Sequence, residues 1–124
     1  MISWDTATPG KSWEGIVIRN VKEKEISLKF NRVQNAATGL TLQSASPLVA
    51  SCDLSLNATA VRISGAFAKP RLVKNTVLKN KEAAVVITDG AQPVVTENRI
   101  QDNLQEGILV DGGRPDHLPQ FHRP

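Results

Sequence analysis

The sequence predicts an all-β fold, a right-handed parallel β-helix (solenoid) of about five coils. Short aliphatic blocks recur every 21 to 24 residues, and Pro and Asn punctuate each repeat. The aliphatic residues within a block are two positions apart, which is the period of a strand. The blocks are also too short, and too broken by Gly, Pro and Asn, for helices. Because one such coil cannot bury its own inward side chains, successive coils must stack.

The repeating block is a small residue followed by aliphatic-x-aliphatic, and it opens at Gly15, Gly39, Ala60, Ala84 and Gly107. Its copies give two inward columns, and a second block gives two more. The four predicted columns are Ile16/Leu40/Val61/Val85/Ile108, Ile18/Leu42/Ile63/Ile87/Val110, Leu28/Val49/Leu72/Val95 and Val33/Leu54/Val77/Ile100. Every position in them is Val, Ile or Leu, which predicts one continuous core.

Asparagines mark the predicted turns. One turn position holds Asn31, Cys52, Asn75 and Asn98, and a second, which closes each coil, holds Asn35, Asn57, Asn80 and Asn103. Stacked Asn side chains bond the turn backbone and one another, and Asn tolerates left-handed geometry there. We therefore expect a structural Asn ladder of Asn31, Asn75 and Asn98. In it Cys52 is a small buried packing residue rather than a reactive thiol.

The length of 124 residues predicts one domain. We expect residues 1–113 to form the β-helix, with 1–14 as an N-terminal cap coil that contains Trp4 and Trp13. Residues 114–124 form a Pro-rich C-terminal tail. No signal peptide precedes the strand predicted at Ile2–Trp4, so we expect the chain to belong to a longer protein. A single cysteine excludes an internal disulfide, and no apolar run approaches the ~18 residues of a membrane span.

The charge pattern argues against a nucleic-acid partner. Fifteen basic and twelve acidic residues are interspersed, and the few aromatic residues are too scattered for a base-stacking platform. One coil is crowded with basic residues that could attract phosphates or acidic sugars: Lys69, Arg71, Lys74, Lys79 and Lys81. Acidic residues in the same or adjacent coils favour cross-coil ion pairs instead; these are Asp53, Glu82 and Glu97.

The segments before the repeats are Ile2-Ser3-Trp4, Thr8-Pro9-Gly10 and Trp13-Glu14-Gly15-Ile16-Val17-Ile18. Together with the repeats they resemble the pectate-lyase-like superfamily of right-handed parallel β-helix proteins over residues 2–113. That superfamily includes lyases, hydrolases, epimerases and members without known activity, so the resemblance implies the fold rather than one reaction. It also implies an extracellular or cell-envelope location.

Enzymes of that superfamily place acidic clusters, often with Arg or Lys bases, on the outward face of the first strand column. The outward residues of that column in this sequence are Val17, Thr41, Arg62, Val86 and Leu109. They supply neither paired carboxylates nor a calcium cage. We therefore expect this column to be a ligand- or partner-binding face.

The weak candidates for a catalytic site are Asp89 and Asp111, which end the first strand in neighbouring coils. At one strand spacing apart, two carboxylates can share a proton or a cation. Each is followed by Gly, however, and Asp-Gly is ordinary turn chemistry. His117 and His122 lack a third metal ligand, and the phosphate-loop-like run at 8–12 lacks the first glycine of that motif. We expect no metal and no cofactor.

Two functions remain open from the sequence. The first is a non-catalytic β-helix scaffold or recognition module, part of a larger envelope or secreted protein, that presents its strand face to a polysaccharide or protein. The second is a carbohydrate-active enzyme (polysaccharide lyase, hydrolase or epimerase) whose catalytic residues lie partly outside this segment. Uncovered coils at the ends, together with outward Val86 and Leu109, also predict a homo-oligomer or docking to the parent chain.

Overall fold

The computed structural model describes residues 2–5, 11–20, 27–105 and 107–111, and the statements below concern these residues. They form thirteen short strands and no helix. The strands are β1 (Ile2–Trp4), β2 (Ile16–Arg19), β3 (Ser27–Lys29), β4 (Asn31–Val33), β5 (Thr38–Gln43), β6 (Leu48–Ala50), β7 (Thr59–Ser64), β8 (Arg71–Val73), β9 (Thr76–Leu78), β10 (Val85–Thr88), β11 (Val94–Thr96), β12 (Arg99–Gln101) and β13 (Ile108–Asp111). The predicted all-β class is confirmed, and the predicted strand at Ile2–Trp4 is present.

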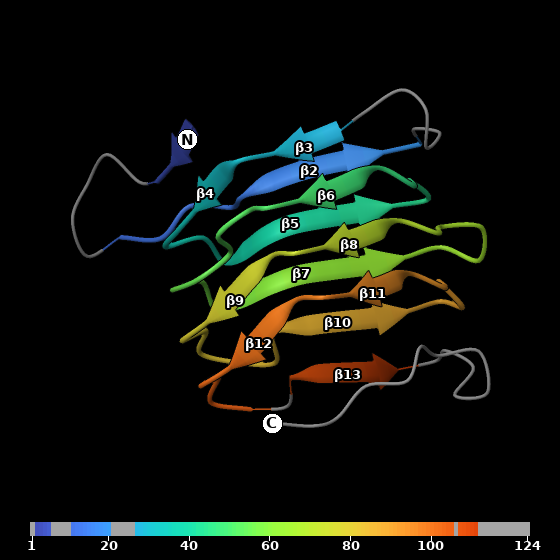
Figure 1. Ribbon diagram of the computed structural model, residues 1–124. Helices are drawn as coiled ribbons and strands as arrows, with labels where there is room; N and C mark the ends of the chain where they lie inside the picture. Colours follow the sequence, from blue (N-terminus) through green and yellow to red (C-terminus); the bar gives the residue numbers. More distant parts are fainter. Residues whose placement is uncertain (1, 6–10, 21–26, 106, 112–124) are drawn as a thin grey trace.

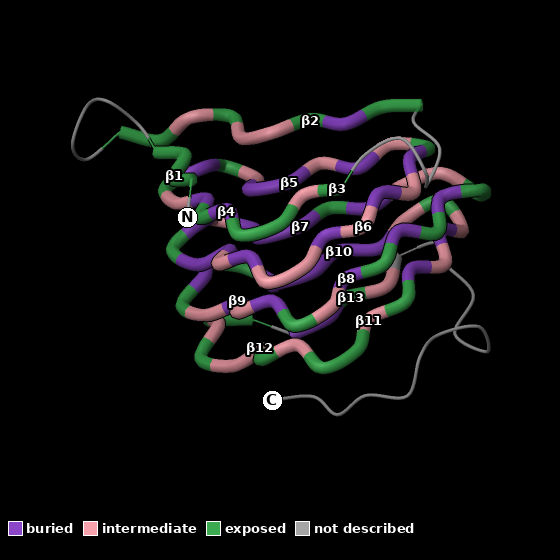
Figure 2. The backbone as a smooth tube through the Cα atoms, turned by 45° about the horizontal axis from the view of Figure 1, so that its top comes forward, coloured by how far each residue is buried: buried purple, intermediate pink, exposed green. Residues whose placement is uncertain are grey.

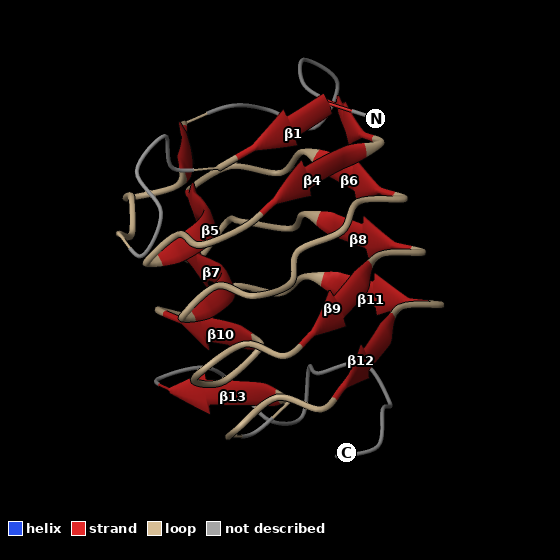
Figure 3. Ribbon diagram, turned by 90° about the vertical axis from the view of Figure 1, so that its left-hand side faces the viewer, coloured by secondary structure: helices blue, strands red, loops and turns tan. Residues whose placement is uncertain are grey.

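The strands stack into three faces around a common core (Figure 1, Figure 3). A five-stranded sheet has the order β13-β10-β7-β5-β2, and a four-stranded sheet has the order β11-β8-β6-β3. The pairs β1-β4 and β12-β9 form a third face, because Asp53 bridges Arg32 on one side and Thr76 on the other. All pairing is parallel, as it is when each strand lies beside its copy in the next coil. The described coils make about four turns, close to the expected five.

The register reproduces the predicted aliphatic columns. Ile16 pairs with Leu40, Leu40 with Val61, Val61 with Val85, and Val85 with Ile108. The largest fully buried side chains come from these columns, including Leu40, Leu42, Leu54, Ile63 and Ile87. Figure 2 shows the buried positions running through the stack from coil to coil. Fully burying one such side chain contributes roughly 1.5–3 kcal/mol, so the columns are the main source of stability.

The small residue before the aliphatic block is buried in four of the five copies, at Gly39, Ala60, Ala84 and Gly107. Gly39 and Ala60 are buried, and the aliphatic residue that follows each of them is buried too. Two successive residues therefore lie on the inner side of this bend. A Cβ on Gly39 would lie 2.7 Å from the carbonyl oxygen of Ala60. A Cβ on Gly15 would overlap the carbonyl oxygen of Thr38, and the φ of Gly15 is +102°. The bend therefore has no room for a large residue.

Each coil turns at residues with left-handed backbone geometry. Before the first asparagine position these are Phe30, Ser51, Lys74 and Glu97, with φ between 55° and 58°. Before the second they are Asn35, Leu56, Lys79 and Asp102. The expectation that the stacked asparagines adopt this geometry was wrong. The chain changes direction one residue earlier, which leaves the asparagine amide free to point into the coil.

Candidate functional site

Asparagine side chains inside the turns join successive coils. Asn98 Oδ1 accepts from the backbone N–H of Asn75 at 2.8 Å and from Asn75 Nδ2 at 2.9 Å. Asn98 Nδ2 in turn donates to the carbonyl oxygens of Leu72 and Thr96. In the second column, Asn80 Nδ2 donates to Asn103 Oδ1 at 2.7 Å. These amides satisfy turn backbone that would otherwise be buried without partners, so their role is structural.

Cys52 occupies an asparagine position and is only 2% exposed. Its Sγ lies 3.4 Å from the carbonyl oxygens of both Leu28 and Ala50, and its backbone N–H donates to Asn75 Oδ1 at 3.0 Å. Burial raises the pKa of the Cys52 thiol, while hydrogen bonds from nearby backbone partly oppose that rise. A buried, protonated thiol is a poor nucleophile, which fits the packing role expected for it.

The second asparagine position is held in the first coil by Ala36. The backbone N–H of Ala36 donates to Asn57 Oδ1 at 3.0 Å. Asn35 lies one residue earlier, is exposed, and donates from Nδ2 to Asp5 Oδ1 at 2.8 Å. The prediction that Asn35 belongs to this column was therefore wrong by one residue. Asn35 has a φ of 58°, and Asn favours that left-handed turn position as well.

The predicted ligand face lies on the outside of the five-stranded sheet. Register brings its five residues together in one row, in the order Val17, Thr41, Arg62, Val86 and Leu109. Val17 is 46% exposed, Leu109 is 38% exposed, and Arg62 is exposed. Val86, expected to add exposed apolar area, is only 6% exposed. Its neighbours in the row are the longer Arg62 and Leu109, and these flank the shorter valine.

A second row lies two residues further along the same strands. By register it contains Arg19, Gln43, Ser64, Thr88 and Asp111. Asp111 therefore pairs with Thr88, and Asp89 lies one residue beyond the pair rather than opposite Asp111. Asp111 ends β13 as expected, whereas β10 ends at Thr88, one residue before Asp89. Asp89 is exposed at a left-handed turn, with Oδ2 3.5 Å from the Thr88 hydroxyl.

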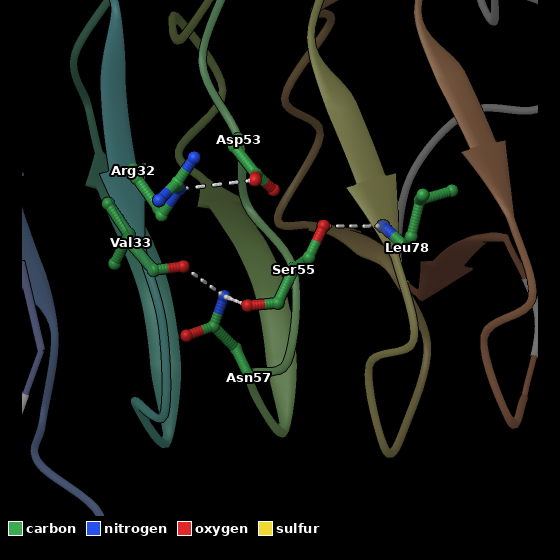
Figure 4. A network of polar contacts seen from close by, with 6 residues as sticks. All are labelled: Arg32, Val33, Asp53, Ser55, Asn57 and Leu78. Atoms are coloured by element: carbon green, nitrogen blue, oxygen red, sulfur yellow. Dashed lines mark hydrogen bonds and ion pairs between the residues drawn. The ribbon is translucent and has the colours of Figure 1, made fainter. Parts of the chain in front are cut away.

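The third face has an ion pair at its centre (Figure 4). Arg32 Nε lies 3.5 Å from Asp53 Oδ2, and these side chains are 46% and 28% exposed. Asp53 Oδ1 is buried and has no hydrogen-bond partner among the described residues. Nearby, Ser55 Oγ accepts from the backbone N–H of Leu78 at 3.0 Å. The sequence pattern indicated a cross-coil ion pair for Asp53, but nothing in it pointed to the unpaired oxygen.

A family model described as the right handed beta helix region matches residues 10–118. This stretch contains the stacked coils and nearly all of the strands described above. The chain belongs to the right-handed β-helix family. No curated protein and no solved structure matched the chain.

The five basic residues that were expected to crowd one coil of the β-helix do not lie on a single surface. Lys69 lies in the turn before β8, and Arg71 begins β8 itself. Lys79 and Lys81 lie in the turn between β9 and β10, at another corner of the coil. Lys74 Nζ lies 3.7 Å from Glu97 Oε2 in the next coil, with both side chains well exposed. This is one cross-coil ion pair of the expected kind, and exposed pairs of this type contribute at most about 1 kcal/mol.

Metal ligands do not gather in the described part of the β-helix, where no group of three His, Cys, Asp or Glu side chains could hold an ion. His117 and His122, the Pro-rich tail at 114–124 and most of the loop at 8–12 lie outside the described residues. The described residues also contain no helix long and apolar enough to cross a bilayer.

Proposed function

We propose that this β-helix is a non-catalytic recognition module that binds an extended polysaccharide along the outer face of the five-stranded sheet. The observation that supports the proposal is the pair of rows on that face. One row combines apolar side chains with the guanidinium of Arg62, and the other presents the amide of Gln43 and the hydroxyls of Ser64 and Thr88. Sugars combine apolar ring faces with hydroxyl groups, and acidic sugars add carboxylates.

The spacing of the rows suits a chain-like ligand. Parallel strands repeat about every 4.8 Å, so the same kinds of groups recur at short, regular steps along the solenoid axis. The strands are held on their inner side by the buried columns and at their turns by bonded asparagines. A face fixed in this way loses little conformational freedom on binding, which favours affinity.

The placement of carboxylates supports the non-catalytic part of the proposal. Glycoside hydrolysis uses two carboxyl groups that flank the scissile bond. In the described part of this face, register places Asp111 in the second row, and Asp89 lies outside both rows, beyond the end of β10. Asp53 lies on a different face, where it pairs with Arg32.

A binding experiment tests the proposal directly. The protein is titrated by calorimetry with polygalacturonate, with alginate and with an uncharged glucan. Arg62→Glu should weaken binding of the two acidic polymers by about tenfold or more, which corresponds to the loss of one charge-assisted contact of about 1.4 kcal/mol. Lys29→Glu is the matched control, since it makes the same charge change at an exposed position of β3 on the four-stranded sheet. Absence of binding, or equal losses in both variants, would contradict the proposal.

The enzymatic alternative is tested with the same polymers. Pectin, alginate and glycosaminoglycans should remain uncut with or without calcium, as judged by ultraviolet absorbance of unsaturated products and by new reducing ends. Product formation that Asp89→Ala or Asp111→Ala abolishes would instead identify this β-helix as part of a carbohydrate-active enzyme.

A further inference from the structure

Both ends of the described solenoid present unpaired strand edges. No described strand pairs with the outer edges of β1, β2 and β3 at the N-terminal end, or with those of β11, β12 and β13 at the C-terminal end. Such edges expose rows of backbone N–H and C=O groups that can pair with another chain.

The N-terminal edge is also apolar. Ile2 and Trp4 are 62% and 43% exposed, although register places Trp4 directly over the buried Val33. Val17 on β2 is 46% exposed. At the other end, Leu109 on β13 is 38% exposed. Exposed apolar residues beside open strand edges mark a surface for association.

The strands at the two ends of the solenoid are offset in complementary ways. At the N-terminal end the third face begins one strand before the five-stranded sheet, because β1 precedes β2. At the C-terminal end the five-stranded sheet finishes one strand after the third face, because β13 follows β12. A second copy placed below the first would therefore set its β1 beside β12 and its β2 beside β13. Two faces would continue without a break, while β11 and the next β3 would be separated by one strand position.

Register defines the contacts of that junction. Continuing the columns places Leu109 beside Val17 of the next copy and Ile100 beside Trp4 of the next copy. The same register places Asp111 at the position next to Arg19 of the next copy. The junction would thus repeat the coil-to-coil packing found within the molecule.

Charge also favours opposite ends meeting. The described residues of the first coil include four basic and two acidic ones, a balance of 4 − 2 = +2: Lys11, Arg19, Lys29, Arg32, Asp5 and Glu14. The described residues from β11 to β13 include one basic and three acidic ones, a balance of 1 − 3 = −2: Arg99, Glu97, Asp102 and Asp111. Two N-terminal ends would repel each other, whereas an N-terminal and a C-terminal end attract.

We propose that this β-helix associates head to tail, with the C-terminal edge of one copy docked on the N-terminal edge of the next. The partner is a second copy of this chain. Because the contact joins two different surfaces, it does not close on itself, and assemblies grow with protein concentration. The proposal does not rest on polysaccharide binding. Val17, Leu109, Arg19 and Asp111 are the end members of the two rows on that face, but the association is measured without polysaccharide.

Charge reversal provides the test. In size-exclusion chromatography with light scattering at low salt, the mass of the wild type should rise with concentration beyond that of a dimer. Arg19→Glu and Asp111→Arg should each shift the protein to a monomer, because each opposes like charges at the junction. An equimolar mixture of the two variants should restore assembly, and so should the double variant, because opposite charges then meet at every junction.

The mixture separates this junction from the other ways of associating. A contact between two N-terminal ends would stop at a dimer even in the mixture, and Asp111→Arg, which leaves that end unchanged, would not weaken it. Thermal melts followed by circular dichroism show whether each variant is folded, and the double variant provides a result even if one single variant is not. A wild type that stays monomeric at all concentrations, or assembly that the mixture fails to restore, would overturn the proposal.

Discussion

Cys52 Sγ lies 3.4 Å from the carbonyl oxygen of Leu28 and takes the place of an asparagine amide. One coil later Asn75 Nδ2 donates to the equivalent carbonyl, that of Val49, at 3.0 Å, and Asn98 Nδ2 donates to that of Leu72 at 2.7 Å. A thiol has a single weak donor and accepts poorly, whereas an amide has two donors and a good acceptor. The column is therefore weakest at Cys52.

Replacing this thiol by an amide should strengthen the fold. We expect Cys52→Asn to raise the free energy of unfolding by about 1 kcal/mol, the usual net value of a buried hydrogen bond. Cys52→Ala should lower it, because it removes the S–H donor and leaves a cavity. Urea denaturation followed by circular dichroism measures both. A Cys52→Asn variant less stable than the wild type would show that the position is too tight for the amide.

The raised pKa of Cys52 predicts a dependence on alkaline pH. Burial keeps the thiol protonated in the folded chain, while the unfolded chain loses the proton at the ordinary pKa. The stability contributed by the protonated thiol is fully present below that ordinary value. It is lost as the pH rises from there through the raised folded pKa. Denaturation curves over this window should show a fall in the wild type that is absent in Cys52→Ala, and an identical fall in both would contradict the prediction.

The aliphatic columns predict the largest losses of stability. Leu72 is 3% exposed on β8, so Leu72→Ala should lower the free energy of unfolding by about 2–5 kcal/mol through lost burial and a new cavity. Leu104 is the matched control, because it is 80% exposed, and Leu104→Ala should change stability by less than about 0.5 kcal/mol. If the two substitutions cost the same, the assignment of Leu72 to the core would be wrong.

Substitutions at two glycines compare the cost of steric crowding with the cost of backbone strain alone. Both Gly15 and Gly90 have positive φ, but a Cβ on Gly15 would meet a carbonyl oxygen at 1.7 Å, whereas on Gly90 the nearest atom is 3.7 Å away. Gly90→Ala should therefore cost about 1–2 kcal/mol, the strain of left-handed geometry alone. Gly15→Ala should cost clearly more, since the backbone around β2 must shift. Thermal melts of the two variants compare these costs, and equal shifts would count against the crowding at Gly15.

The repeat could be predicted because burial imposes one residue class on every coil. Leu40 and Val61 belong to the same column whatever the turns between them contain. Turn residues are harder to align, because coils differ in length and Asn suits two adjacent turn positions. Asn35 was therefore placed where Ala36 lies. Strand ends carry the same uncertainty of one residue, since Asp89 was expected to end a strand that ends at Thr88.

The outward row of the candidate face could also be predicted, since it alternates with the buried columns along each strand. The exposed fraction of each residue in that row could not be predicted from the sequence. Val86 is nearly covered although it alternates with the inward Val85 and Ile87, and no sequence spacing specifies how far surrounding side chains cover an outward residue. The unpaired oxygen of Asp53 depends on side-chain orientation beside Arg32, which no sequence spacing specifies.

Chain length varies at one corner of the coil and is fixed at another. Between the inward residues of the four-stranded sheet and the third face the spacing is always five, as from Leu72 to Val77, and bonded asparagines hold that corner. From the five-stranded to the four-stranded sheet the spacing is seven at Leu42 to Val49 but nine at Ile63 to Leu72, with no change in register. Phe67 lies near the middle of the longer loop and is 89% exposed. A foreign peptide grafted after Ala66 should leave the coils beneath it intact, so this corner allows new loops to evolve, or to be engineered, on an unchanged frame.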